Sequence, residues 1–465
     1  MWVPLTRPSR RLAVVAAVIV GVALAVSALA GLLNNAGGAY GDAIRGMVQW
    51  APFVLLLAIS FPVAIAIAAR PQIGVLLIAA LVPYNGLLVI VKHPPFTEGY
   101  KEALTIYVLV WSVLNVIGKR RTKERYPRYV APLAFYVLIG IVSAARVGGV
   151  NGMVGLKTSF FYLLIPIALW LCPFTKKDRD WLVSIIMVDA FITSLYGLYQ
   201  QVIGASGLLS LGYQYGTSIR TTGPWLRSFS SFSQHSAFGL FLTMALLIGT
   251  SVSLADTKRL RSKLFLLVSP VILLALALTF VRSAWLGLAV GAIYLAIHRY
   301  RVLLFFAPFA LVGLLVLPLS FEKGAFYSGS FQERQTSWTQ NLNRAANPFG
   351  NGLGTTGSAA EKSLQVKKLT TDFYQPDNNY YKVLYELGVL GLFFFAMMLI
   401  AAFLYTREVE IQVAGADQAL IIGVSATILA VMIAAYTAVY FEIFPNDVFF
   451  WLLLGTVTSC VRESS

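Results

Sequence analysis

Residues Pro376–Gly391 read PDNNYYKVLYELGVLG, and here the chain changes from a long polar loop into an apolar helix. The polar segment before this stretch covers about residues 321–375. Three polar residues, Asp377–Asn379, stand at the entrance of the helix, and Lys382 and Glu386 lie inside it. Ionisable side chains within membrane helices are rare and are usually functional. The entrance of this helix is therefore the first candidate site.

The rest of the chain is strongly apolar. Of its 465 residues, 58% are hydrophobic and only 12% are charged, whereas soluble domains carry about 25% charged residues. Apolar runs of ~20 residues, the length that crosses a bilayer as a helix, recur along the chain. We therefore predict an all-α polytopic membrane protein, a single membrane domain over residues 1–465 with roughly fourteen transmembrane helices. The expected spans are about 12–33, 50–69, 72–91, 102–118, 129–145, 156–172, 181–202, 235–254, 264–281, 283–298, 302–320, 380–404, 418–440 and 447–461.

The basic residues indicate the orientation of these spans. If the N-terminus is cytoplasmic, the dense Lys and Arg clusters at residues 119–128, 176–179 and 258–263 all fall in cytoplasmic connections, as is usual for membrane proteins. Both termini are then cytoplasmic, and the two long polar loops, residues 203–234 and 321–378, are external. The net charge of +16 is explained by this topology and by anionic lipid headgroups, so no nucleic-acid partner is expected.

The first external loop is rich in groups that bind phosphate and sugar. It ends in RTTGPWLRSFSSFSQHSAFG, residues 220–239, in which Arg220 and Arg227 flank Trp225, and His235 follows where the next helix begins. Arginine forks suit phosphate oxygens, and aromatic faces suit sugar rings. Aromatic residues and arginines are also common at the membrane interface without any such role. Two arginines at this spacing favour a binding site.

Further candidates follow along the chain. Arg282 lies in a short turn between two apolar runs. In the second loop, residues 331–345 have the spacing of an amphipathic helix that lies on the outer membrane surface, and this helix would carry Arg334 and Trp338. A Gly-rich turn at residues 347–354 either brings backbone N–H groups to an anion or is an ordinary flexible loop.

Several of these polar residues also have simple structural interpretations. Asp377 or Asn378 is a candidate helix N-cap. Lys382 and Glu386, four residues apart, are a candidate neutralising pair. Asp189, a further intramembrane acid, is either functional or hydrogen-bonded to a neighbouring helix.

Signatures of nucleotide or metal use are absent from the sequence. It contains no phosphate-binding Gly-Lys loop and no dinucleotide fingerprint. Its three histidines lie far apart, with no acidic or Cys cluster at metal-ligand spacing. We therefore expect no cofactor and no metal. An external active site without nucleotides needs a substrate that is already activated, such as a lipid-linked diphosphate sugar.

Four segments, in this order, resemble the O-antigen ligase and polymerase superfamily. RSFSSFSQHSAFG at 227–239 resembles its Arg-x-x-Gly-Thr-Phe-x-Asn-Pro-Asn-x-Leu-Ala segment, with Ser230 in place of Gly and His235-Ser236 in place of Pro-Asn. VRSAWLG at 281–287 is similar to its Ser-Arg-Gly turn, and PDNNYYKVLYELGVLG is similar to its helix after the loop. The loop pattern is similar in its residues Arg334, Trp338, Pro348, Gly350, Gly352 and Gly354. The resemblance covers about residues 220–404.

The resemblance implies a membrane glycosyltransferase of the GT-C type that acts without metal on undecaprenyl-diphosphate-linked saccharides. Its place would be the periplasmic or outer face of the bacterial inner membrane, with a flippase and a chain-length regulator of the same pathway as possible partners. The family's diphosphate-binding arginines would correspond to Arg227, Arg282 and Arg334, to which we add Arg220. Ligases of the family carry His and a small polar residue where this chain has Asp377-Asn378, a pair more similar to the polymerases.

We therefore predict a polysaccharide polymerase for O-antigen, capsule or exopolysaccharide, which transfers a glycan from undecaprenyl diphosphate to the non-reducing end of a lipid-linked repeat unit, with inversion. Asp377 is the first candidate for the base and His235 the second. The residues expected to contact sugar are Trp225, Trp338, Asn378, Asn379 and Tyr380.

Two alternatives remain open. The first is a ligase that moves glycan from lipid diphosphate to lipid A-core or another acceptor. The second, of another class, is a transporter of lipid-linked sugars or anions. Transporters usually show internal repeats with matched broken helices, whereas this sequence has one interruption, at residues 83–86, and one large asymmetric loop.

Overall fold

The computed structural model describes residues 60–90, 99–117, 126–216, 218–306, 348–367, 376, 378–436 and 438–464. Eight of the helical segments in these ranges are long and apolar enough to cross a membrane. This confirms the prediction of an all-α polytopic membrane protein. The predicted span at 12–33, residues 50–59 of the span at 50–69 and residues 307–320 of the span at 302–320 lie outside the described residues.

The elements, in chain order, are a short apolar helix at Ser60–Ala69, then α3 (Pro71–Leu81), η1 (Val82–Val89), α4 (Tyr100–Leu114), α5 (Val130–Val147), α6 (Gly149–Phe160), η3 (Phe161–Leu163), α7 (Leu164–Leu171), α8 (Lys176–Ser210), β1 (Thr221–Thr222), β2 (Trp225–Leu226), α9 (His235–Ala255), α10 (Leu260–Ala277), α11 (Arg282–His298), η4 (Arg301–Phe306), α14 (Gly357–Lys367), α15 (Asn379–Gln412), α16 (Gly415–Ala434), η5 (Tyr440–Glu442) and α17 (Asn446–Ser464).

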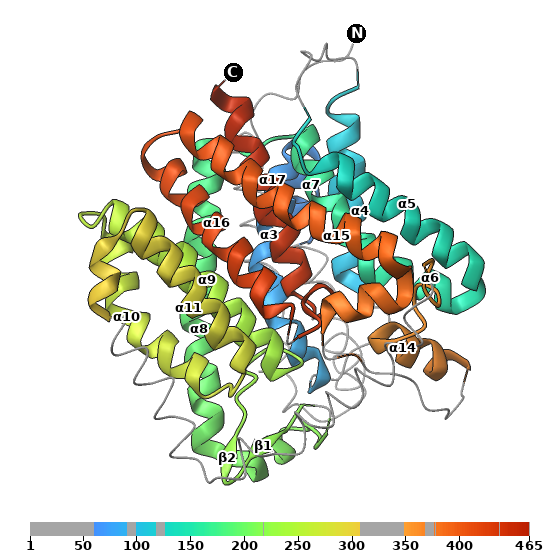
Figure 1. Cartoon of the computed structure of the whole chain (residues 1–465). Helices are drawn as coiled ribbons and strands as arrows, with labels where there is room; N and C mark the ends of the chain where they lie inside the picture. The colour runs from blue at the N-terminus through green and yellow to red at the C-terminus, as the bar shows by residue number, and fades with distance from the viewer. Residues whose placement is uncertain are drawn as a thin grey trace, which may run out of the picture.

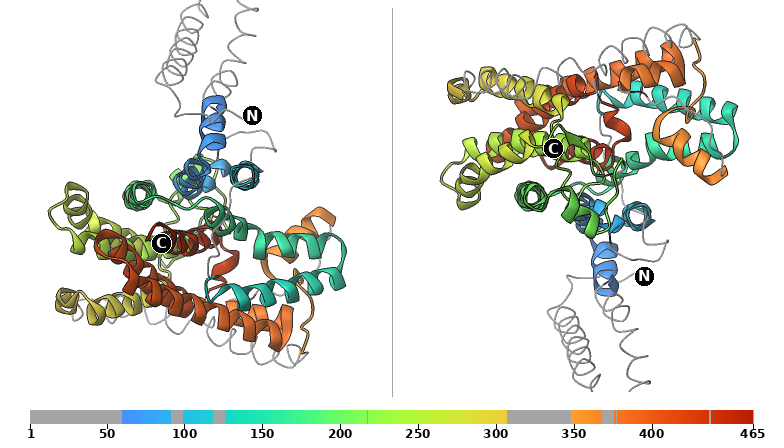
Figure 2. Two further views of the ribbon diagram at one scale, coloured as in Figure 1. Left: turned by 90° about the horizontal axis from the view of Figure 1, so that it is seen from above. Right: turned by 90° about the horizontal axis from the view of Figure 1, so that it is seen from below.

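Helix α9 forms the centre of the bundle because it is apolar on every side. In its most apolar window 89% of the residues are buried, against 28% in α5 and in α10. Helix α9 packs against α10, α11 and α16. Seen along the bundle (Figure 2), α17 lies near the middle, with α10 and α11 on one side and α5, α6 and α14 on the other.

The two ends of the bundle differ. In Figure 1 the strands β1 and β2 and the helix α14 lie at the end of the molecule away from the C-terminus. These elements belong to the two polar segments that the sequence places outside the membrane. We call this end the loop end, and the opposite one the C-terminal end.

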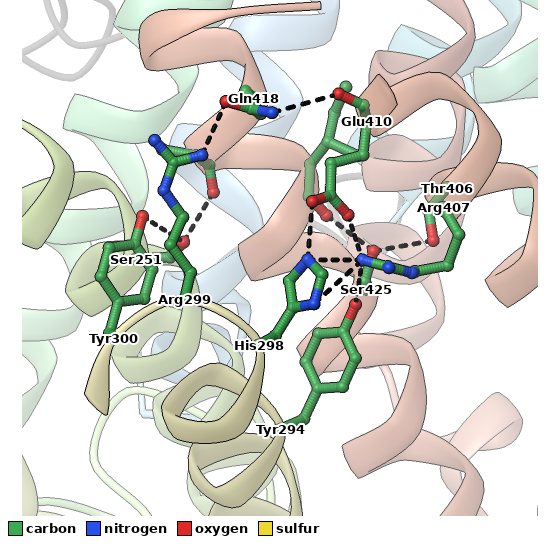
Figure 3. Close-up of polar contacts among 12 residues, drawn as sticks. Ser251, Tyr294, His298, Arg299, Tyr300, Thr406, Arg407, Glu410, Gln418 and Ser425 are labelled. Atoms are coloured by element: carbon green, nitrogen blue, oxygen red, sulfur yellow. Dashed lines mark hydrogen bonds and ion pairs between the residues drawn. The ribbon is translucent and has the colours of Figure 1, made fainter. Parts of the chain in front are cut away.

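Ionic contacts between helices concentrate at the C-terminal end. Figure 3 shows the cluster in which the Nε2 of His298 lies 2.7 Å from Glu410 Oε1, while Arg407 pairs with Glu410 and donates to the Tyr294 hydroxyl at 3.1 Å. Helices α11 and α15 are joined by these contacts. A second pair, Arg179 with Asp417, is bidentate at 2.9 and 2.8 Å and joins α8 to α16.

Two long helices are kinked at glycine. Gly204 in α8 (φ 65, ψ −173) and Gly388 in α15 (φ 70, ψ −169) adopt a conformation that is essentially restricted to glycine. The first external loop was predicted to begin at residue 203, but α8 continues through the kink to Ser210. The loop therefore begins later than predicted, because a glycine kink redirects the helix without ending it.

The kink at Gly388 is filled by the Gly-rich turn. A kink releases carbonyl groups from their helical hydrogen bonds, and buried carbonyls need new donors. Asn351 N donates to Tyr385 O at 2.8 Å, and Gly352 N donates to Glu386 O at 3.0 Å. A Cβ atom on Gly388 would lie 2.0 Å from Pro348 O. The Gly-rich turn can therefore pack against the kink only because the residues at the contact, Gly350 and Gly388, have no side chain.

This close packing predicts that Gly388→Ala destabilises the protein more than Gly204→Ala does. Both substitutions impose the same backbone strain, of about 1–3 kcal/mol. At Gly204 an added Cβ meets no atom within 4 Å, so strain is the whole cost, whereas at Gly388 the clash with Pro348 is added to it. Thermal unfolding of the purified variants measures the difference. Equal losses of stability would show that the turn does not pack into the kink.

Candidate functional site

The hairpin in the first polar segment brings two arginines together. Strands β1 and β2 pair antiparallel around a turn in which Gly223 has φ 57. Beyond the paired strands, Arg227 N donates to Arg220 O at 2.8 Å. Two arginines seven positions apart in sequence are therefore neighbours across the hairpin. Trp225, on β2, is 46% exposed and available for contact with a ligand.

The hairpin docks on the turn between α10 and α11. Ser228 N donates to Leu278 O at 2.9 Å. The Arg227 guanidinium donates to Phe280 O at 3.0 Å through Nη2, and to Thr279 O at 3.4 Å through Nε. Arg282, the first residue of α11, follows this turn and is exposed. The helix N-terminus at Arg282 adds partial positive charge to the arginines gathered here.

His235 belongs to the same group of side chains. It is the first residue of α9 and is 7% exposed. The charges of Arg227 and Arg220 are close enough to act on its imidazole. Arg220, Arg227 and His235 thus lie close together at the loop end, and Arg282 follows two residues after Phe280, which Arg227 contacts. We call Arg220, Arg227, His235 and Arg282 the arginine cluster.

The buried side-chain amide of Gln200 fixes the backbone conformation of Phe229 and Ser230, which follow Arg227 in the chain. Gln200 Oε1 accepts from Ser230 N at 2.8 Å and from Phe229 N at 3.2 Å, while Gln200 Nε2 donates to Ser230 O at 2.9 Å. Ser230 has φ 56, a left-handed conformation that glycine adopts most easily. This explains why the segment that this stretch resembles has Gly at the same place. Gln200 was not singled out from the sequence, because a single amide in an apolar helix gives no pattern.

The entrance of α15 has structural roles for its asparagines and its tyrosine. Asn378 caps the helix, because its Oδ1 accepts from Tyr381 N at 3.1 Å. Asn379 Oδ1 accepts from Phe441 N at 3.3 Å, and the Tyr380 hydroxyl donates to Met432 O at 2.7 Å. Asn378 and Asn379 are 5% and 2% exposed. Each of these three side chains thus has a structural partner, and the sugar contacts proposed for them stay a prediction.

Three predicted site residues cannot be placed. Asp377, Arg334 and Trp338 lie outside the described residues, as does the predicted amphipathic helix at residues 331–345.

Behind the entrance of α15 lies a buried ion cluster. The Lys382 ammonium is 2.6 Å from Glu386 Oε2 and 2.7 Å from Glu442 Oε1. The three side chains are 5%, 1% and 7% exposed. The predicted pair of Lys382 and Glu386 thus has a third member, Glu442. We call these three residues the Lys382 cluster. Glu442 was missed because it follows a different span, more than fifty residues along the chain.

The Lys382 cluster also binds the Gly-rich turn. Glu386 Oε1 accepts from Gly354 N at 3.2 Å, from Thr356 N at 3.1 Å and from the Thr356 hydroxyl at 2.8 Å. Backbone N–H groups of the turn therefore do reach an anion, as one sequence interpretation proposed. The anion is the protein's own glutamate. Its place at the N-terminal end of α14 is one where negative charge is favourable.

The space beside the Lys382 cluster is small. A cavity of about 20 Å³ is lined by Asn379, Lys382, Glu442 and surrounding apolar residues. This volume holds about one water molecule. The cluster therefore anchors α14, α15 and η5 to one another.

One comparison with known proteins gives a family. Residues 264–396 match the family model described as O-antigen ligase. The matched segment runs from α10 through Arg282 and the Gly-rich turn into the first half of α15, which includes Lys382 and Glu386. A search of curated proteins finds no match to the chain.

The burial of the Lys382 cluster predicts that Lys382→Met destabilises the protein by about 3–5 kcal/mol, because two buried glutamates lose their cation. The matched control is Lys157→Met. Lys157 pairs with Glu102 at 2.9 Å, but its side chain is 57% exposed, and such a pair contributes at most about 1 kcal/mol. Thermal unfolding gives both values. The double variant Lys382→Met/Glu442→Gln should recover part of the loss, and equal effects of the two single variants would contradict this role.

Proposed function

We propose that this chain, a member of the O-antigen ligase and polymerase superfamily, is a polysaccharide polymerase. It would transfer a glycan from undecaprenyl diphosphate to the non-reducing end of a lipid-linked repeat unit. The observation that carries the proposal is the arginine cluster, in which Arg227 binds the turn that Arg282 follows and acts, with Arg220, on His235 at the start of α9. Guanidinium groups match the oxygens of a diphosphate in charge and in geometry.

The chemistry requires little from the protein besides charge and position. The oxygen of an acceptor hydroxyl attacks the anomeric carbon of the donor glycan. The bond from that carbon to the diphosphate oxygen breaks, and its electron pair leaves with the diphosphate. Arg220, Arg227 and Arg282 would stabilise this developing negative charge, so the reaction needs neither nucleotide nor metal. A single displacement of this kind inverts the anomeric centre.

An in-line displacement also bears on which of the two candidate bases would accept the proton of the acceptor hydroxyl. A displacement in line places the attacking hydroxyl opposite the leaving group. His235 lies beside the arginines and therefore on the leaving-group side. The proton of the hydroxyl would be accepted on the other side, and Asp377 stays the first candidate for that role. His235 stays the second candidate.

The cellular setting follows from this substrate. Lipid-linked repeat units would reach the loop end at the periplasmic face of the bacterial inner membrane, after a flippase has moved them across. Both termini would then be cytoplasmic. A chain-length regulator is a further possible partner of the polymerase.

A ligase is the second candidate function, because the matching family model is described as O-antigen ligase. The donor and the leaving group are the same in both reactions, and only the acceptor differs. Glycan ladders from a deletion strain separate them. Loss of the ladder with one repeat unit still attached indicates a polymerase, whereas loss of every unit indicates a ligase.

The proposed diphosphate contact predicts that Arg220→Lys and Arg282→Lys each slow polymerisation of a lipid-linked repeat unit by roughly tenfold or more, because Lys keeps the charge but loses the fork. Arg227 is a poorer test, since its guanidinium also holds the hairpin on the Thr279–Phe280 turn. Arg301→Lys, an exposed arginine after α11, is the matched control. Wild-type rates in both test variants would contradict the proposal.

The proposed base predicts that Asp377→Asn lowers the rate by roughly a hundredfold to ten-thousandfold, the usual contribution of general-base catalysis. Folding should be unchanged, because Asn378 supplies the cap of α15. The polymerisation rate in vitro, with thermal stability alongside, is the measurement. A wild-type rate would remove Asp377 as the base and leave His235 in its place.

A further inference from the structure

A second site lies at the C-terminal end of the bundle, away from the arginine cluster. It is a cavity of about 490 Å³, within the size range of small-ligand sites. Residues from five helix ends line it, namely Ala69, Arg70, Pro71, Gln72, Asn115, Cys172, Thr175 and Lys177. We call it the Arg70 pocket.

Positive charge dominates the Arg70 pocket. Arg70 and Lys177 are the two charged side chains in its lining, and both carry a positive charge. Arg70 uses only Nη2 in its contacts with Asp178, at 3.0 and 3.2 Å, so within the described part of the chain Nη1 and Nε keep their hydrogens for a ligand. Lys177 is exposed.

The nearest acid, Asp178, pairs with Arg70 and offsets only part of this charge. Asp178 is buried, and its two oxygens accept from Arg70 and from the backbone and hydroxyl of Thr175 in the capping box of α8. The N-terminus of α3 at Pro71, by contrast, has no side-chain cap. Pro71 has no N–H and Ile73 N donates to Arg70 O at 3.0 Å, so this helix end contributes to the pocket mainly the partial positive charge of its dipole.

The surroundings of the Arg70 pocket are apolar and open to lipid. Leu114 and Ile117, at the end of α4 that supplies Asn115, are 48% and 68% exposed. The pocket also lies at the start of α3 and at the end of α7, and both of these helices are apolar. A ligand with a phosphate head and hydrocarbon chains would place each part against matching surface.

We propose that the Arg70 pocket binds the phosphate-bearing headgroup of an anionic phospholipid. Basic pockets between membrane helices at the cytoplasmic face commonly hold such headgroups. The phosphate would accept hydrogen bonds from the Arg70 guanidinium and from Lys177, and the acyl chains would lie along the end of α4. This assignment is independent of the glycosyl transfer proposed at the loop end.

The test uses the full chain in phosphatidylcholine nanodiscs with and without phosphatidylglycerol. Wild-type protein should retain phosphatidylglycerol in native mass spectrometry and unfold at a higher temperature when it is present. Lys177→Glu should weaken retention by about tenfold, since each basic residue near a membrane surface contributes on the order of fivefold. Glutamate near a helix N-terminus is favourable, so this variant should fold.

Two controls make the result decisive. Lys263→Glu changes the same charge on an exposed residue of α10 outside the pocket and should leave retention unchanged. Arg70→Gln should lose retention as Lys177→Glu does. Equal retention by Lys177→Glu and Lys263→Glu would overturn the proposal. So would stabilisation by inorganic phosphate in phosphatidylcholine alone without any preference among lipids, because the ligand would then be a soluble anion.

Discussion

The burial of the Glu386 carboxylate is the constraint on which the loop end depends. A charge removed from water inside a membrane helix must find a counter-ion and hydrogen-bond donors, or it costs several kcal/mol. Glu386 finds Lys382 on its own helix, and Gly354 and Thr356 on the polar segment before it. Lys382 in turn reaches Glu442 on η5. One carboxylate therefore fixes the mutual positions of three segments that are remote in sequence.

Local patterns in the sequence predicted what local physics determines. The apolar runs predicted most of the described helices, and the spacing of four predicted the pair of Lys382 and Glu386. Arg282 was expected in a turn between two spans, and it begins α11. Each of these features depends on residues that are close in sequence, so their period and spacing are visible without the fold.

Contacts between distant segments were not predictable in this way. The Arg227 contact with the α10–α11 turn and the Glu442 contact with Lys382 join segments about fifty or sixty residues apart. Asn379 was expected to bind sugar because it is polar and stands at a loop, and nothing in the sequence indicates that its Oδ1 accepts a hydrogen bond from the Phe441 backbone. A sequence shows which side chains can donate or accept hydrogen bonds. Only the packed structure shows which of these side chains already have a hydrogen-bond partner.

The length of α8 has a consequence for where the substrate meets the protein. From Lys176 to the kink at Gly204 the helix is about 42 Å long at 1.5 Å per residue, more than the ~30 Å of a bilayer's hydrocarbon layer. The kink therefore falls near the level of the phospholipid headgroups, and the residues after it run across the membrane surface. A prenyl carrier keeps its diphosphate at that same depth while its tail stays in the hydrocarbon. Under the proposed function, the donor would be bound without leaving the bilayer, and the thickness of the surrounding membrane would set how well the diphosphate and the arginines are matched in height.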